Sequence, residues 1–334
     1  MNPRALKRAL KRSFAITAVV LLIGAATIAG IVAFGTRSVS NPAESQSLGA
    51  VLRQVDYSGL PELAQFKARD GTSIAYRAYP VAGSEKIALL IHGSAAHSHS
   101  MHGLARALQT AGAASVYALD MRGHGGSGKH GDIAYIGQLE DDVADVIRHL
   151  RAKHANAKLV LVGFSSGGGF AIRFAGSRFG RLADGYVFLA PFIHHDSPTN
   201  RPGLKAWTTP HVPRIIGLTI LNRFGITQFN HLTAISFGIA PSNPAKLTPH
   251  YSYRLATNFR PNEDYKADLR GLKRPARLLI GTSDRYFDIA HYPAQVISHA
   301  PTIDLRAVKG VGHMGLVAAP AGIQAAVEAV QSLP

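Results

Sequence analysis

Short apolar runs alternate with amphipathic stretches from about residue 60 to the C-terminus. An Asp70-Gly71 pair, which favours a tight hairpin, lies between the first two strand-like segments. Further along, short apolar runs have the length of strands, at 87–91, 116–119, 159–162, 186–190, 278–280 and 303–308. Residues 138–154 place their apolar side chains on one helical face. Buried strands separated by helices are typical of a mostly parallel sheet with helices on both faces, so we predict an α/β domain over residues 60–334.

The alternation is interrupted between about residues 191 and 270. This segment holds nine of the 18 prolines and the only tryptophan, Trp207. Because proline cannot donate to a sheet ladder, we expect short helices here and no strands, with one helix starting at Pro213. We interpret the segment as a helical cap inserted into the α/β domain. A second domain with its own core is the alternative.

A long apolar segment lies near the N-terminus. Residues 14–35 contain no charge, and as a helix they would extend about 33 Å, enough to cross a hydrocarbon core of about 30 Å. Residues 1–13 carry a cluster of cations, whereas only Arg37 follows closely, so the positive-inside rule places the N-terminus in the cytoplasm. We predict a single-pass membrane anchor, then a linker over residues 36–59 and an extracytoplasmic domain. A cleavable signal peptide, which would leave a secreted protein, and a buried soluble helix are the alternatives.

The composition fits a folded chain with a sizeable core. Of 334 residues, 46% are hydrophobic and 17% are charged, which excludes an intrinsically disordered protein. The chain has no cysteine, which excludes disulfides, Cys-ligated zinc, iron–sulfur clusters and a cysteine nucleophile. The net charge of +16 suggests anionic lipid or acidic ligands as neighbours, or simply a basic surface. No zinc finger or RNA-binding motif accompanies this charge, so we predict no nucleic-acid partner.

A G-x-S-x-G motif, Gly163-Phe164-Ser165-Ser166-Gly167, comes directly after the fifth strand pattern and before a helical stretch. This strand–turn–helix setting is the one that a nucleophile elbow requires. The glycines permit a turn that exposes the Ser165 hydroxyl at the carboxyl edge of the sheet and directs the N–H of Ser166 toward a developing oxyanion. A second oxyanion donor should come from the loop after residues 87–91, where the N–H of Ser94 is the candidate.

A nucleophilic serine needs a base, and the base needs an acid that orients it. Asp284 and His313 each follow one of the last two strand patterns, so both should lie at the same sheet edge as Ser165. The order serine, aspartate, histidine is that of the hydrolases with this elbow. Asp288 is the rival acid, and capping a short helix is its alternative role. We predict a triad of Ser165, His313 and Asp284.

Other polar clusters have structural interpretations. The glycine-rich loop 120–128 lacks the Gly-Lys-Ser/Thr of a phosphate-binding loop, so we expect a structural turn. Four histidines crowd residues 92–102 without any carboxylate among them, which disfavours a metal site. His194-His195-Asp196 opens the insertion and is expected at the surface or the mouth of a pocket. We therefore predict neither a metal nor an organic cofactor.

Taken together, the motifs resemble those of the α/β-hydrolase superfamily over roughly residues 60–334. More narrowly, they are similar to the lysophospholipase and monoacylglycerol-lipase-like group that is described together with serine aminopeptidases. The matching residues are His92-Gly93-Ser94, Asp120-x-Arg122-Gly123-His124-Gly125-x-Ser127, Gly163-x-Ser165-x-Gly167, Gly281-x-x-Asp284 and Gly312-His313. The resemblance implies Ser165 as nucleophile, His313 as base, Asp284 as acid and a cap after Ala190. The membrane segment and the sequence of the cap depart from the pattern.

The combined expectation is a membrane-anchored serine hydrolase that cleaves carboxylic esters. Mono-acylated lipids such as lysophospholipid or monoacylglycerol are the favoured substrates. An amidase or aminopeptidase with the same triad is one alternative, and a non-catalytic lipid-binding protein on the same fold is another. Acyl length, head group and oligomeric state are not determined by the sequence.

Overall fold

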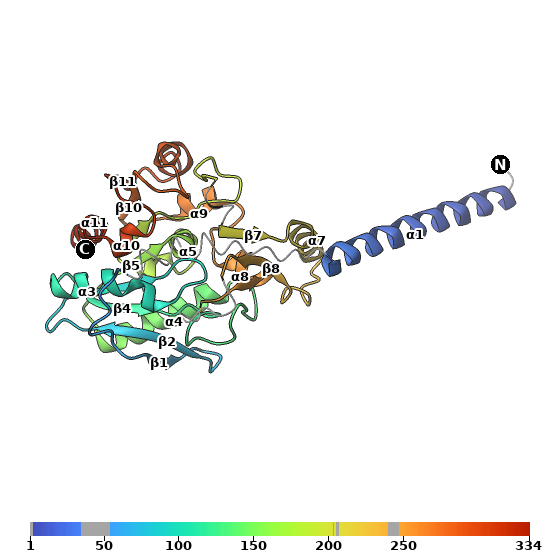
Figure 1. The fold of residues 1–334 in the computed structure, drawn as a ribbon. Coiled ribbons are helices and arrows are strands. Elements are labelled where there is room, and N and C mark those ends of the chain that lie inside the picture. Colours follow the sequence, from blue (N-terminus) through green and yellow to red (C-terminus); the bar gives the residue numbers. More distant parts are fainter. Residues whose placement is uncertain (1–2, 35–53, 203, 205–206, 240–246) are drawn as a thin grey trace.

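The structure, a computed structural model, describes residues 3–34, 54–202, 204, 207–239 and 247–334. Within these residues an eight-stranded sheet forms the centre, in the order β1-β2-β4-β3-β5-β6-β10-β11 (Figure 1). Its strands are β1 (Ala64–Lys67), β2 (Ser73–Tyr79), β3 (Lys86–Ile91), β4 (Ser115–Leu119), β5 (Lys158–Phe164), β6 (Gly185–Leu189), β10 (Ala276–Gly281) and β11 (Ile303–Val308). β1 and β2 pair antiparallel, as do β2 and β4, and every other neighbouring pair is parallel. The predicted mostly parallel sheet is confirmed.

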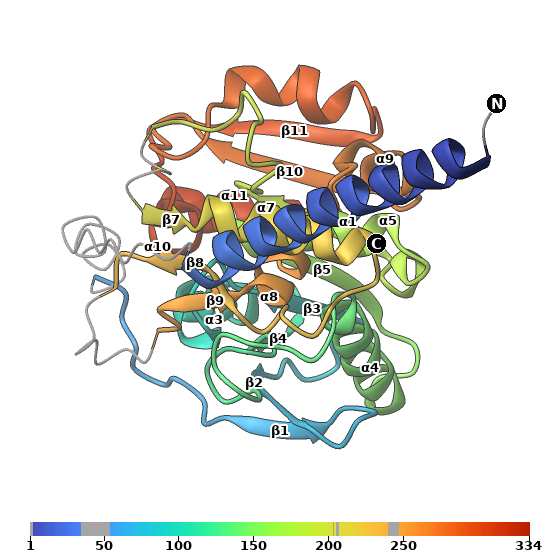
Figure 2. The ribbon, with the colours of Figure 1, turned by 90° about the vertical axis from the view of Figure 1, so that its right-hand side faces the viewer.

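Helices cover both faces of this sheet. On one face α3 (His102–Thr110) packs against α10 (Gly315–Ala318) and α11 (Pro320–Gln331). On the other face α5 (Ser166–Gly176) packs on β5 and β6 and against α9 (Tyr265–Gly271) (Figure 2). The helix predicted for residues 138–154 is α4 (Gln138–Lys153). An ion pair between Arg173 and Glu140 joins α4 to α5.

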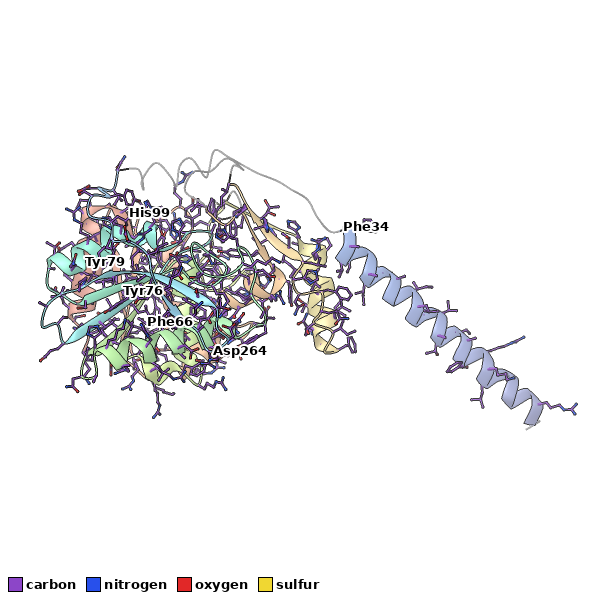
Figure 3. The ribbon with its side chains drawn as sticks, turned by 90° about the horizontal axis from the view of Figure 1, so that it is seen from below. Phe34, Phe66, Tyr76, Tyr79, His99 and Asp264 are labelled. Carbon is purple, nitrogen blue, oxygen red and sulfur yellow. The ribbon has the colours of Figure 1, made fainter. Side chains whose placement is uncertain are left out.

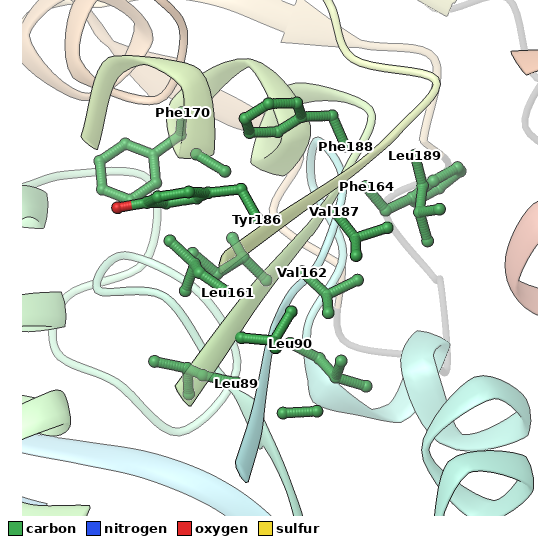
Figure 4. Packing of buried hydrophobic residues seen from close by; sticks show 14 of the residues in the cluster. Leu89, Leu90, Leu161, Val162, Phe164, Phe170, Tyr186, Val187, Phe188 and Leu189 are labelled. Carbon is green, nitrogen blue, oxygen red and sulfur yellow. The ribbon is translucent and has the colours of Figure 1, made fainter. Parts of the chain in front are cut away.

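The strands with continuous apolar runs form the centre of the hydrophobic core. Every residue of β4 and β6 is buried, because helices cover both sides of the sheet. Figure 4 shows Leu161 and Val162 of β5 between Leu90 of β3 and Val187 of β6. These side chains have no exposed surface, which is the environment that a run of branched apolar residues requires.

The insertion between β6 and β10 contains short helices and also strands. Among the described residues of the insertion, helices include α7 (Val212–Arg223), α8 (Tyr253–Asn258) and α9, and α7 begins where the Pro213 signal predicted a helix. The expectation that this segment has no strands is wrong, because β7 (Thr208–Pro210), β8 (Thr233–Phe237) and β9 (His250–Ser252) form an antiparallel sheet. Pro210 ends an edge strand and Pro249 precedes β9, so neither position interrupts the ladder.

Part of the cap belongs to the core of the central sheet. Phe237, Tyr251, Leu255 and Phe259 belong to the same buried cluster as the central sheet. The insertion thus packs on the body through this shared core, and a second buried cluster joins its Leu218, Ala234 and Tyr253 to Val32 of the N-terminal helix.

The N-terminal helix α1 (Pro3–Phe34) projects away from the body (Figure 1), and Figure 3 shows Phe34 at its near end. Residues Leu10–Phe34 are long and apolar enough to cross a membrane, and almost all of their surface is exposed. This exposure excludes the interpretation as a buried helix of a soluble core. A signal sequence near the N-terminus can meet the same criteria of length and hydropathy. Of the predicted linker, residues 36–53 lie outside the described residues.

The last turns of α1 pack on the cap helix α7. Val32 is buried against Leu218, and a Cβ atom at Gly217 would lie 2.6 Å from Val32 Cγ2, so glycine permits the close approach. The buried guanidinium of Arg214 donates to the carbonyl oxygens of Val32 (2.7 Å) and Ala33 (3.1 Å). A cation at the end of a helix satisfies carbonyls that have no partner within the helix. α1 is therefore docked on the cap by specific contacts.

Candidate active site

The predicted site residues lie at one edge of the sheet. β3, β5, β10 and β11 run parallel, so their carboxyl ends lie at the same edge. Ser94, Ser165, Asp284 and His313 each follow one of these ends within a few residues. The topology thus places all four in one region, although they come from distant parts of the chain.

Ser165 occupies a strained turn between β5 and α5. Its φ of 56° and ψ of −119° lie outside the regions that a non-glycine residue normally adopts. Its own N–H donates to the carbonyl of Leu189 (2.9 Å), and its carbonyl accepts from Phe192 N (3.0 Å) and Gly169 N (3.0 Å). These backbone contacts hold the conformation in place.

The two glycines of the motif are sterically required. A Cβ at Gly163 would overlap the carbonyl oxygen of Gly167, and a Cβ at Gly167 would overlap the carbonyl oxygens of Ile91 and His92. The elbow therefore packs backbone against backbone, between its own two sides and against the end of β3. This is the crowding that a G-x-S-x-G turn predicts.

His313 and Asp284 lie in direct contact. His313 Nδ1 is 2.7 Å from Asp284 Oδ2, and both side chains are buried. The other carboxylate oxygen, Oδ1, accepts from the backbone N–H groups of Tyr286 (2.8 Å) and Phe287 (3.0 Å). With the carboxylate held from both sides, Nδ1 carries the proton and donates it, which leaves Nε2 of His313 free to accept one.

Aromatic rings surround the imidazole of His313. Ring centroids of Phe164, Tyr286 and Phe287 lie 4.8, 5.0 and 5.3 Å from that of His313. Phe164 directly precedes Ser165 in the chain, so the packing brings the imidazole close to the elbow. The rings restrict the imidazole to one orientation.

Asp288 has a different environment. Its carboxylate accepts from Ala290 N (3.1 Å), caps a short 3-10 helix (Ile289–His291) and pairs with Arg201 at 3.1 Å. The hydrogen bond from Ala290, together with Arg201, lowers the pKa of Asp288. Of the two candidate acids, only Asp284 contacts His313, whereas Asp288 has the capping geometry that was its alternative role.

The loop after β3 lies against the elbow. A Cβ at Gly93 would be 3.2 Å from Ser165 Cβ, and the hydroxyls of Ser94 and Ser166 hydrogen-bond to each other. Ser166 is the first residue of α5, so its N–H has no acceptor within the helix. The two predicted oxyanion donors thus come from neighbouring segments beside Ser165.

A family model described as "Serine aminopeptidase, S33" matches residues 83–316. The chain belongs to this family. It is therefore a serine hydrolase of the α/β-hydrolase fold, and the predicted resemblance to the superfamily and to its monoacylglycerol-lipase-like group is confirmed. A comparison with curated protein sequences found no match.

Solved structures with the same fold include lipases. The monoacylglycerol lipase of Paleococcus ferrophilus is 23% identical, with a TM-score of 0.59 over 78% of this chain and 98% of that chain. A soluble variant of the monoglyceride lipase of Saccharomyces cerevisiae, in complex with a substrate analogue, is 19% identical, with a TM-score of 0.62 over 82% and 94%. A membrane phospholipase A described as a bacterial virulence factor is 19% identical, with a TM-score of 0.54 over 96% and 99%. At these identities the likeness establishes the shared fold.

The glycine-rich loop 120–128 of this serine hydrolase has structural contacts. Asp120 accepts from the backbone N–H groups of Ser98 (2.7 Å) and Gly126 (2.8 Å). Arg122 pairs with Asp142 of α4 at 2.7 Å and with Asp70 of the β1–β2 hairpin at 2.9 Å. Hydrogen bonds from Arg122, with its charge, lower the pKa of Asp70 to about 2. The loop connects sheet, helix and hairpin, as its structural interpretation predicted.

The histidines that suggested a metal site fall into two groups. Burial lowers the pKa of His92 to about 4, so this residue is a neutral core histidine. Near the start of the cap, His194, His195 and Glu263 bring possible ligand atoms within 4.8 Å of one another. His194 already pairs with Glu263 (3.2 Å) and Asp196 (3.3 Å), so these groups satisfy one another and we assign them no metal role.

Two residues of the cap hydrogen-bond to the loop after β3, and no local sequence pattern indicates either contact. The hydroxyl of Tyr251, on β9, accepts from the N–H of Ala95 at 2.5 Å. The backbone N–H of Thr248 donates to the carbonyl oxygen of Ala95 at 2.8 Å. More than 150 residues separate Tyr251 from Ala95, so only the folded chain reveals this contact.

Proposed function

We propose that this serine hydrolase is membrane-anchored and cleaves carboxylic esters of mono-acylated lipids with a Ser165–His313–Asp284 triad. The observation that carries the proposal is the buried 2.7 Å contact between His313 Nδ1 and Asp284 Oδ2, beside a serine in the strained elbow conformation. A neutral imidazole with its proton on Nδ1 is the form that can remove a proton from a serine hydroxyl.

In the proposed reaction, Ser165 Oγ attacks the ester carbonyl carbon while His313 Nε2 takes the hydroxyl proton. The N–H groups of Ser94 and Ser166 bind the oxyanion of the tetrahedral intermediate. The intermediate collapses when His313 returns the proton to the departing alcohol, which leaves an acyl group on Ser165. Water then attacks the acyl-enzyme with His313 again as base, and the carboxylic acid is released.

Two features favour a lipid ester over a peptide amide. The neighbours described above include two lipases that act on monoglycerides and a membrane phospholipase. Beyond residue 40 the chain also carries a net charge of +10, which favours anionic lipid surfaces over the ammonium group of a peptide N-terminus. Amide cleavage by the same triad is the alternative that the family description raises.

The anchor is part of the same proposal. α1 combines an apolar span with preceding cations, and by the positive-inside rule the hydrolase body is extracytoplasmic. The membrane phospholipase A matches 96% of this chain, a share that has to include most of the N-terminal segment. The contacts of Arg214 and Leu218 with the end of α1 support a retained anchor, because a cleaved signal peptide would have no role in the folded protein.

Labelling and hydrolysis test this function together. We expect a fluorophosphonate probe to label the full-length protein in detergent, and Ser165→Ala to abolish the labelling. Among p-nitrophenyl esters, monoacylglycerols, lysophospholipids and aminoacyl p-nitroanilides, we expect the esters to be hydrolysed and the anilides to be left intact. Efficient cleavage of the anilides would establish the amidase alternative, and an unlabelled wild type would establish a non-catalytic protein.

A further inference from the structure

The loop that carries the oxyanion candidate Ser94 is held by the cap. The next residue, Ala95, is fully buried and has a φ of 62°, which is unusual for a residue with a side chain. Both of its backbone polar groups bond to cap residues, the N–H to Tyr251 Oη (2.5 Å) and the carbonyl to Thr248 N (2.8 Å). Such a conformation persists only where surrounding contacts hold it.

The direction of each hydrogen bond at Tyr251 follows from His124. This histidine is fully buried, and burial lowers its pKa well below the usual value, so the ring is neutral. Its Nδ1 faces the carbonyl oxygens of Met121 and Arg122, both at 3.3 Å, and therefore carries the proton. Its Nε2, 2.6 Å from Tyr251 Oη, has to accept.

The hydroxyl of Tyr251 can then make its two hydrogen bonds in only one way. Burial raises the pKa of its phenol, so the hydroxyl keeps its proton and donates it to His124 Nε2. The lone pairs of the same oxygen are left to accept the N–H of Ala95. The chain of bonds from Ala95 through Tyr251 to His124 is fully satisfied, and in a buried site each lost partner is costly.

Two peptide groups flank Ser94, and each has a fixed partner. His92 accepts from Met121 N at Nε2 (3.2 Å), so its Nδ1 carries the proton and donates to the carbonyl of Gly93 (2.7 Å). In a trans peptide the carbonyl and the following N–H point in opposite directions, so this bond sets the direction of the Ser94 N–H. Tyr251 fixes the next peptide, between Ser94 and Ala95.

We propose that Tyr251 of the cap is a positioning residue for the oxyanion hole, because its hydroxyl holds the peptide after Ser94. This inference rests on the proposed function, in which the N–H of Ser94 binds the oxyanion. This contact couples the cap to the chemistry, because a displacement of β9 would release Ala95 and loosen one of the two peptide groups that flank Ser94. The cap would then control turnover as well as access to the site.

The test is Tyr251→Phe in the full-length protein in detergent, with Tyr253→Phe as the matched control. Tyr253 lies two residues further along the chain, and its hydroxyl bonds to Thr219 Oγ1 (2.9 Å), away from the loop. Losing one oxyanion donor costs about 10²–10³ in kcat, and a donor that is loosened but present should cost less. We therefore expect Tyr251→Phe to lower kcat on a short p-nitrophenyl ester about 10–100-fold with KM changed less than about threefold.

Further measurements separate positioning from general damage. A boronic acid, which forms a tetrahedral adduct with the serine, should bind Tyr251→Phe more weakly by about the same factor as the loss in kcat/KM. His124→Leu removes the acceptor of the Tyr251 hydroxyl and should reproduce the loss even if Tyr251→Phe folds poorly. Melting temperatures and circular dichroism check folding in each variant.

The proposals can fail separately. An active wild type whose Tyr251→Phe and His124→Leu variants turn over as fast as Tyr253→Phe would overturn the positioning role alone. A large rise in KM with unchanged kcat would also overturn it, because that result assigns Tyr251 to substrate binding. A wild type that neither reacts with fluorophosphonate nor hydrolyses esters would overturn the proposed function and this inference with it.

Discussion

Replacing Asp284 by asparagine tests the triad most sharply, because the structure predicts how the new amide will orient. Oδ1 of Asp284 accepts two backbone N–H groups, from Tyr286 and Phe287. In Asp284→Asn the amide oxygen must stay there, since turning it would leave both N–H groups facing an NH₂. The NH₂ then occupies the position of Oδ2 and donates to Nδ1 of His313.

This orientation gives His313 the wrong tautomer. With Nδ1 accepting, the proton moves to Nε2, and the ring can no longer take a proton from Ser165. In a serine protease the same change lowers kcat by about 10⁴. We expect a loss of three to four orders of magnitude here, which corresponds to about 4–5 kcal/mol in the activation free energy. Folding should be preserved, because the shape and the two backbone bonds are kept.

Asp288→Asn is the matched control. Its side chain caps a short helix and pairs with Arg201, and asparagine caps about as well as aspartate. We expect kcat within about twofold of wild type and a stability loss below about 1 kcal/mol from the exposed ion pair. The assay is kcat for a p-nitrophenyl ester together with the melting temperature of each variant. Near-normal turnover in Asp284→Asn would refute the tautomer argument, and a collapse confined to Asp288→Asn would reverse the assignment of the acid.

Two further predictions concern the anchor and the elbow. Full-length protein should fractionate with membranes and stay there in high salt. Deletion of residues 1–40 should release a soluble enzyme that keeps its esterase activity. A full-length protein found in the soluble fraction at native size would contradict the anchor. Gly167→Ala should lower stability by about 1–3 kcal/mol or more and abolish fluorophosphonate labelling, because the added Cβ would overlap the carbonyl oxygens of Ile91 and His92. Gly30→Ala, with open space around the added atom, should change neither property, and equal melting temperatures for the two variants would show that the elbow tolerates the methyl group.

The strands and the elbow could be predicted because their signals are local. A run such as 159–162 is apolar at consecutive positions because its strand is buried on both faces, and this pattern is visible without any partner. The glycines around Ser165 form one contiguous motif, and the Cβ that Gly163 lacks would overlap the carbonyl oxygen of Gly167 in the same turn. Because β5, β10 and β11 are parallel, Ser165, Asp284 and His313, which follow these strands, could also be expected at one edge of the sheet.

Proline content misled the interpretation of the cap. Proline disfavours the interior of a sheet, but Pro210 and Pro249 lie where no ladder hydrogen bond is needed. Whether a proline falls at a strand end or in a ladder depends on which segments pair. The pairing of β8 with β7 and β9 is a tertiary event, so composition alone could not indicate this small sheet.

Contacts between distant residues were decided only by the tertiary structure. Asp284 and Asp288 lie four residues apart, and the 2.7 Å contact with His313 distinguishes the aspartate beside the histidine from the aspartate that caps a helix. The hydroxyl of Tyr251 on Ala95 and the guanidinium of Arg214 at the end of α1 join segments more than 150 residues apart. A hydrogen bond forms only within about 3 Å and over a narrow range of angles, and such positions arise once the core has packed. Hydrophobic periodicity thus determined the elements of this hydrolase, and the packed fold determined which polar groups meet.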